Sequence, residues 1–212
     1  GLRIDRGNLF DPFLNPVPNT KPDRHDVGMV SGACLWIPKI MWDEFGGFPE
    51  HFFYIAEDTY ICCMARLWGF PVQVVNNSGF NHWIGKNIGG GRVDSGKLST
   101  TYKRRYHSER NKSIVMFTCY PILLLLVLFP LHIIMLLVEG ASLSLLKRDV
   151  TAWKKVYAPS IAYLWCNKKR LIADRSRAQK RRVASVREFL APFVWYPHKL
   201  RLILSYGIPD IQ

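Results

Sequence analysis

The sequence FGGFPEHFFYIAED, residues 45–58, combines two glycines, several aromatic side chains and a terminal pair of acids. Gly46 and Gly47 allow a positive φ or a close backbone approach. Glu57 and Asp58 are adjacent, and burying two carboxylates beside aromatic rings is costly, because repulsion and lost hydration both oppose ionisation. Two interpretations follow: a structural loop whose acids cap the next helix, or part of a site that uses these acids.

Short helices and strands are predicted around this stretch. Pro38 suits the first position of a helix, and Gly69 stops the helical spacing that follows the acid pair. Short apolar runs bounded by turn residues predict buried strands. In chain order we expect an irregular segment over 1–27, a strand over 33–37, a helix from Pro38 to about Phe45, a helix from Asp58 to Gly69, a strand over 71–75, a strand or loop over 79–83, and a mobile glycine-rich loop over 85–101.

Positive charge is concentrated in the C-terminal third. Residues 147–212 hold 15 Lys and Arg against 4 Asp and Glu, whereas residues 1–113 hold 14 against 11. Such a tail has three candidate partners: anionic lipid headgroups, nucleic acid or an anionic substrate. Aromatic residues over 153–165 precede a basic cluster over 168–182, a pattern typical of a helix on an anionic membrane surface. The simpler alternative is a solvated charged helix face, and the lack of a nucleic-acid-binding motif argues against nucleic acid.

A charge-free apolar segment precedes this tail. Residues 114–138 contain no formally charged side chain, and 25 helical residues at about 1.5 Å each would cross ~30 Å of hydrocarbon. Basic residues flank both ends, and the positive-inside rule keeps both flanks cytoplasmic. We therefore predict a shallow or re-entrant hairpin with limbs over 114–130 and 131–146, bending near Pro130. His132 is expected to face a protein neighbour or the interface.

The ordered residues of the N-terminal half resemble glycosyltransferase family 2, most closely its rhamnosyltransferase-like branch. The resemblance covers about residues 30–112 and depends on the order of its elements, since no single element is specific. The residues that carry it are Gly32, Phe45-Gly46-Gly47-Phe48, Glu50, Phe53, Glu57-Asp58, Arg66, Gly69, His82 and Arg110-Asn111. The apolar segment and the basic helix after it also resemble tails in that branch.

This resemblance implies an α/β fold of the GT-A type and inverting transfer from a nucleoside diphosphate sugar. Asp58 is then the expected general base, which takes the proton from an acceptor hydroxyl. Glu57 would orient the site or bind acceptor hydroxyls. The other substrate-binding residues implied by the resemblance are Gly46, Gly47, Phe53 and Arg110.

The implied cofactor is a divalent metal ion, Mg or Mn. His82 matches the family's late metal-ligand histidine, and imidazole is a plausible ligand beside diphosphate oxygens. The alternative is a structural histidine that forms hydrogen bonds. The family's Asp-x-Asp metal motif is missing from the 31 residues before Gly32, and Pro49 and Tyr60 stand where the family pattern has acids.

We therefore expect a C-terminal part of a longer enzyme, with most of the metal held by residues outside this chain. The expected parts are the acceptor-side half of a GT-A domain over 1–112, which lacks the nucleotide-binding half, a hydrophobic membrane segment or re-entrant hairpin over 113–146, and a basic amphipathic helical tail over 147–212.

The predicted function is sugar transfer from a nucleoside diphosphate sugar to a saccharide or lipid-linked acceptor in cell-envelope or polysaccharide assembly. The predicted location is the cell (inner) membrane, with the catalytic part on the cytoplasmic side, where it meets anionic lipid. Five cysteines without a C-x-x-C pair fit a reducing compartment. One alternative is a non-catalytic membrane-anchoring or interaction module that keeps a glycosyltransferase remnant. Another, a nucleic-acid-binding membrane protein, leaves the ordered pattern from Gly32 to His82 unexplained.

Overall fold

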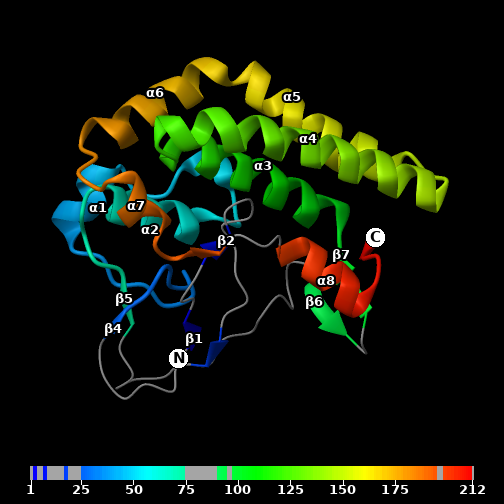
Figure 1. Ribbon diagram of the computed structural model, residues 1–212, viewed down its shortest axis with the longest axis horizontal. Helices are drawn as coiled ribbons and strands as arrows, with labels where there is room; N and C mark the ends of the chain where they lie inside the picture. Colours follow the sequence, from blue (N-terminus) through cyan, green and yellow to red (C-terminus); the bar gives the residue numbers. More distant parts are fainter. Residues whose placement is uncertain are drawn as a thin grey trace.

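The computed structural model describes residues 2–3, 7–8, 17–18, 25–74, 90–94, 97–194 and 198–211, and these are mostly helical. The helices are α1 (Lys39–Phe45), the 3-10 turn η1 (Glu50–Phe52), α2 (Glu57–Leu67), α3 (Tyr102–Cys119), α4 (Ile122–Lys147), the π-helical turn η2 (Trp153–Tyr157), α5 (Ala158–Cys166), α6 (Lys168–Lys180), α7 (Val186–Leu190) and α8 (His198–Tyr206). In Figure 1, α3 to α6 form a layer of long helices, with α1, α2 and α7 beneath one end and α8 beneath the other.

The strands in the described ranges are short and pair in four small sheets. They are β1 (Leu2–Arg3), β2 (Gly7–Asn8), β3 (Val17–Pro18), β4 (His25–Asp26), β5 (Gln73–Val74), β6 (Gly90–Asp94), β7 (Lys97–Thr100), β8 (Phe193–Val194) and β9 (Asp210–Ile211). Strand β7 pairs with β6 antiparallel and with β9 parallel, and β4 pairs with β5 antiparallel. The remaining pairs are β1–β3, antiparallel, and β2–β8, parallel. The α/β sandwich of a GT-A domain stays a prediction.

The two predicted helices around the acid pair are confirmed. Pro38 precedes α1, and Gly46 ends it with a φ of 78°. Helix α2 is followed by Gly69, which has a φ of 81°. Because α2 is enclosed by α3 and α6, most of its side chains are buried, and the ones that are not are Glu57, Asp58 and Arg66.

The strand predicted over 33–37 is wrong, whereas the one over 71–75 is confirmed in part by β5. Residues 33–37 are irregular, and the Trp36 side chain is 83% exposed. The chain before them turns, with the Ala33 N–H donating to Ser31 Oγ at 3.3 Å. Pro38 closes the segment and has no N–H to give to a partner strand. An apolar run of five residues did not decide between a buried strand and an exposed loop.

Helices α3 and α4 form an antiparallel hairpin whose bend lies at Tyr120–Pro121. The bend predicted near Pro130 is wrong, since Pro130 lies inside α4. Proline at a helix start sacrifices no hydrogen bond, and it forces the preceding residue out of helical geometry. Tyr120 accordingly has φ −69° and ψ 134°. Residues 114–119 therefore belong to α3, which also carries the preceding basic segment.

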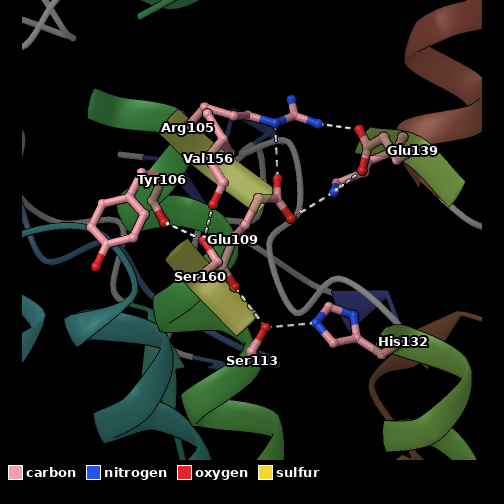
Figure 2. Close-up of polar contacts among 9 residues, drawn as sticks. Arg105, Tyr106, Glu109, Ser113, His132, Glu139, Val156 and Ser160 are labelled. Carbon is pink, nitrogen blue, oxygen red and sulfur yellow. Dashed lines mark hydrogen bonds and ion pairs between the residues drawn. The ribbon is translucent and has the colours of Figure 1, made fainter. Parts of the chain in front are cut away.

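The polar face of this hairpin is buried between its helices (Figure 2). His132 is 4% exposed, and its Nε2 lies 2.8 Å from Ser113 Oγ on α3, so it faces a protein neighbour. Toward the start of α3 and the end of α4, Glu109 lies 3.0 Å from Arg105 Nε, and Arg105 also pairs with Glu139 of α4. These contacts, far apart along both helices, show that α4 runs along α3.

The basic helix α6 packs on the end of α3. Leu171 and Ala178 are buried, and α3 and α6 make the most extensive contact between two helices of the described chain. Arg175 Nη1 donates to the carbonyl oxygens of Phe117 and Tyr120 at 2.7 and 2.8 Å. These are carbonyls that the end of a helix leaves without partners. The predicted helical character of the tail is thus confirmed. One of its basic residues, Arg175, caps the C-terminal end of α3.

Candidate functional site

Asp58 lies in the first turn of α2, with its carboxylate held by backbone N–H groups. Oδ2 accepts a hydrogen bond from Gly32 at 3.0 Å, and Oδ1 accepts one from Thr59 at 2.7 Å. A side chain at position 32 would crowd this contact, because its Cβ would lie 3.3 Å from the Asp58 Cβ. The Asp58 side chain is half-buried at the positive end of the α2 dipole. Each carboxylate oxygen has two lone pairs, so acceptor capacity remains for a hydroxyl.

Glu57 has a different environment from its neighbour. It is half-buried, and its Oε2 has no hydrogen-bond partner among the residues that the structure describes. Burial raises the pKa of the Glu57 carboxyl, and the charge of Asp58 raises it further, against a backbone hydrogen bond that lowers it. The adjacent acids therefore differ: both oxygens of Asp58 accept from N–H donors, whereas Oε2 of Glu57 has no partner among the described residues.

The loop before the acid pair has a strained backbone. Phe53, Ile55 and Ala56 have φ values of 65°, 69° and 75°. The Tyr54 N–H donates to the Phe52 carbonyl at 2.8 Å, and Phe53 has a ψ of −56°, so it is the central residue of a γ-turn of the rare, strained form. Such conformations cost on the order of 1–3 kcal/mol each and persist only where the surroundings fix them.

Asn111 of α3 fixes this loop. Its Nδ2 donates to the carbonyl oxygens of Phe52, Tyr54 and Ile55 at 3.0, 2.9 and 2.7 Å. An amide nitrogen has only two hydrogens, so at least one of these bonds is shared. Asn111 is fully buried, and its bonds satisfy carbonyls that the strained turn cannot pair within itself.

Arg110, predicted to bind substrate, supports the same loop. Its side chain is 6% exposed, and Nη2 donates to the carbonyl oxygens of His51 and Phe52 at 2.8 and 3.0 Å. The guanidinium also lies over the rings of Tyr106 and Tyr163, with Cζ 5.1 and 4.7 Å from their centroids. These contacts position the loop that leads to the acid pair, and contact with substrate stays a prediction.

Gly46 and Gly47 end α1 in a turn that only glycine accommodates without strain. Both have positive φ, 78° and 69°, and their N–H groups donate to the carbonyl oxygens of Asp43 and Trp42. A Cβ on Gly47 would lie 3.0 Å from the Trp42 ring, and one on Gly46 would lie 3.3 Å from Arg177 Nη1. Both glycines also line the cleft described below. This position is compatible with the predicted role in substrate binding, which stays a prediction.

Phe53 is exposed beside the acid pair. Its side chain is 75% exposed, stacks on His107 with ring centroids 5.7 Å apart, and lies under the Lys103 ammonium at 5.4 Å. Burial and the charges of Arg110 and Lys103 lower the pKa of His107 to about 4, so its imidazole is neutral near pH 7. His107 was not among the site residues predicted from sequence, although the basic and aromatic run over 102–111 marked its segment. A neutral, partly exposed aromatic surface of this kind suits the C–H face of a sugar ring.

A cleft with a volume of about 710 Å³ lies near this region but is separate from Asp58. Residues 45–52 form one wall and α6 the other, with Ile114 and Thr118 of α3 between them. Asp58 does not line this cleft, so the acid pair and the cleft are two neighbouring features of one region. Arg170 and Arg177 also line it. Their i, i+7 spacing on α6 was the available signal, but the sequence placed them only within the basic cluster of the tail, whose candidate partners included anionic lipid and an anionic substrate.

The predicted metal ligand His82 lies outside the described residues. Within the ranges that are described, no three His, Cys, Asp or Glu side chains are grouped so that they could hold a metal ion. The divalent cofactor therefore stays a prediction that depends on residues elsewhere.

Comparison of the chain with known protein families, curated proteins and solved structures finds no similar protein. The resemblance to glycosyltransferase family 2 therefore depends on the ordered motif residues alone.

Proposed function

We propose that this chain is the acceptor-side half and membrane-binding part of an inverting glycosyltransferase that uses a nucleoside diphosphate sugar. One observation carries the proposal: motif residues far apart in the sequence hold the Asp58 carboxylate and the loop that precedes it. Gly32 donates to it, and Asn111 holds the strained loop that leads into it. A structural helix cap needs neither a loop with three positive φ values nor an anchor on a distant helix.

In this function Asp58 is the catalytic base. Its free lone pairs accept the proton of an acceptor hydroxyl while that oxygen attacks the anomeric carbon of the donor. The bond from that carbon to the diphosphate breaks on the opposite face, which inverts the configuration. The divalent metal supplies charge compensation for the diphosphate when bound, and residues outside the described part would hold it. Glu57 and the exposed ring of Phe53 are proposed to orient the acceptor.

The hairpin supports a location at the membrane surface. Helix α4 is long and apolar enough to cross a membrane by length and composition, yet it runs antiparallel on α3, whose other side packs in the core. A crossing α4 would carry the buried charges of Arg105 and Glu109 into hydrocarbon, which is costly. We therefore propose that α4 lies in the interface, with its exposed apolar face in the cytoplasmic leaflet.

The decisive test is Asp58→Asn in the intact protein, with sugar transfer as the measurement. Loss of a general base lowers kcat by about 10² to 10⁴-fold. The amide keeps an oxygen for one of the two N–H donors that Asp58 binds, so we expect the free energy of unfolding to fall by no more than about 1–3 kcal/mol. The matched control is Asp43→Asn, which neutralises an exposed acid on α1. Transfer at the wild-type rate by Asp58→Asn would remove Asp58 from the mechanism.

A second candidate, the non-catalytic membrane-anchoring module, is favoured by the exposed face of α4 alone. It predicts vesicle binding without any sugar transfer by the intact protein. The strained loop and its anchors would then have no function, and Asn111→Ala would alter only stability.

A further inference from the structure

The cleft between residues 45–52 and α6 contains polar groups that lack partners. Thr118 is fully buried, and its Oγ1 has no hydrogen-bond partner within the described parts of the chain. The same is true of His51 Nε2. Buried polar atoms without partners cost free energy, so each calls for a ligand or bound water. Both residues line the cleft.

Two arginines complete one wall of the cleft. Arg170 and Arg177 are exposed on the same face of α6, and neither forms an ion pair with any residue that the structure describes. Two neighbouring arginines do have partners: Arg175 of α6 donates to α3 carbonyls, and Arg181, directly after α6, pairs with Glu44 at 2.8 Å. Guanidinium groups bind phosphate oxygens with paired N–H donors.

The cleft also contains carboxylates, which restrict the ligand further. Glu50 and Asp174 line it beside the two arginines, so its formal charge is balanced. A bare phosphate would leave both carboxylates without donors, whereas hydroxyl groups would donate to them. Burial lowers the pKa of His51, and Arg170 lowers it as well although Asp174 opposes this, so the neutral imidazole adds a donor or an acceptor. The donor and acceptor set fits a phosphate ester with free hydroxyls.

The cleft opens beside the apolar hairpin. Thr118 lies in the last turn of α3, directly before the bend at Tyr120–Pro121. Beyond the bend, α4 begins with Ile122 and Leu123, which are 49% and 68% exposed. Thr118, which lines the cleft, is thus only four residues before Ile122, where the apolar face that we place in the membrane begins.

We propose that this cleft binds the headgroup of a lipid, a phosphate ester that carries sugar or polyol hydroxyls. Arg170, Arg177 and the Thr118 hydroxyl contact the phosphate, and Glu50 and Asp174 accept from the hydroxyls. This inference rests on the membrane association within the proposed function. It adds the chemical class of the lipid and the residues that select it.

The test compares binding of the intact protein to phosphatidylcholine vesicles that contain either phosphatidylinositol or phosphatidylethanol. Both lipids carry one phosphodiester charge, but only phosphatidylinositol has ring hydroxyls. We expect a preference of about tenfold or more for phosphatidylinositol in wild type, equivalent to one or two good hydrogen bonds. Arg170→Gln with Arg177→Gln should abolish this preference. The control, Lys169→Gln with Lys180→Gln, removes equal charge from exposed positions of α6 and should weaken binding to both vesicles while keeping the preference.

Thr118→Val separates a ligand role from a structural one. It removes a buried hydroxyl without a partner, so the melting temperature should stay constant or rise, while the preference for phosphatidylinositol falls. Equal binding of both lipids by wild type would overturn the inference, and so would a preference unchanged in both cleft variants. Competition by inorganic phosphate as strong as that by glycerophosphoinositol would assign the cleft to free phosphate and overturn the lipid assignment.

The two proposals fail separately. Asp58→Asn should keep the lipid preference, because Asp58 does not line the cleft. Lipid preference without any sugar transfer by wild type would overturn the proposed function and keep the lipid site. Sugar transfer that depends on Asp58, without a preference for phosphatidylinositol, would keep the proposed function and overturn the lipid site.

Discussion

Asn111 is the residue on which the geometry of the acid pair depends most. Replacing it by alanine removes the donors to three carbonyls and leaves positive φ values at Phe53, Ile55 and Ala56 without support. We expect Asn111→Ala to lower the free energy of unfolding by about 2–4 kcal/mol and to lower kcat for sugar transfer, measured by denaturant unfolding and initial rates. Asn167→Ala is the control, because the one side-chain hydrogen bond that its amide makes to a described residue goes to the Tyr163 carbonyl four residues earlier. Equal effects of the two substitutions would contradict a special role for Asn111.

The Phe53 side chain is expected to lower the stability of the fold, because its backbone is strained, and to improve binding of the acceptor, because its ring is exposed. Glycine at this position accepts a φ of 65° without penalty, and the exposed ring loses little burial when it is removed. We therefore expect Phe53→Gly to leave the free energy of unfolding unchanged or to raise it by up to about 1 kcal/mol, and to raise KM for the acceptor. Phe53→Tyr keeps the ring and the strain, and should behave as wild type. A Phe53→Gly variant with wild-type KM would exclude this ring from acceptor binding.

The hairpin element is held together by a buried cluster of charges (Figure 2). Lys199 Nζ lies 2.7 Å from Glu109 and 2.9 Å from Glu139, and Arg105 contacts both acids. Burial alone would raise the pKa of Glu109, but the charges of Lys199 and Arg105 outweigh it and hold this pKa well below its usual value. Stability from this group is therefore present above the pKa of the unfolded chain and is lost as the pH falls below it.

Glu109→Gln should accordingly destabilise the hairpin. It leaves Arg105 and Lys199, whose side chains are 14% and 22% exposed, with one acid; removal of a buried partner from such a cluster costs up to about 3–5 kcal/mol. The variant should also lose the part of the acid sensitivity that Glu109 causes, which chemical unfolding at a series of pH values would detect. Glu44→Gln, which breaks the exposed pair with Arg181, should cost no more than about 1 kcal/mol. A small and pH-independent effect of Glu109→Gln would show that the cluster contributes little.

At the scale of the whole molecule, the outer face of α4 forms a long apolar surface within the described part of the chain. Leu123, Leu126 and Val127 are 68%, 66% and 60% exposed there, although the opposite face of α4 is buried against α3. Replacing all three by serine should weaken binding to anionic vesicles by about 100-fold or more, since each side chain contributes upwards of 1 kcal/mol in the interface. The double variant Trp36→Ser and Ile40→Ser removes apolar side chains that are 83% and 71% exposed elsewhere, and flotation assays should show wild-type binding. Loss of binding in the second variant alone would place the membrane contact at Trp36 and Ile40 instead of on α4.

The local limits of the elements could be predicted from the sequence because they depend on local backbone restrictions. Pro38 and Gly46 bound α1, and Gly69 follows α2, since proline removes an N–H and glycine accepts a positive φ. The motif order likewise singled out Asp58 as a candidate base. The two prolines of the apolar segment were locally equivalent, so the sequence could not choose between Pro121 and Pro130 for the bend.

Residues 45–58 were recognisable from sequence as glycines, aromatic rings and an acid pair, because composition and spacing are properties of the chain. Their chemistry was decided by contacts between distant segments. Gly32 bonds to Asp58, and Asn111 holds the strained loop before it. Arg170 and Arg177 of α6 line a cleft together with residues 45–52. Hydrogen bonds across 26 to 59 positions and the pairing of helix faces follow from packing of the whole core, which no local pattern encodes.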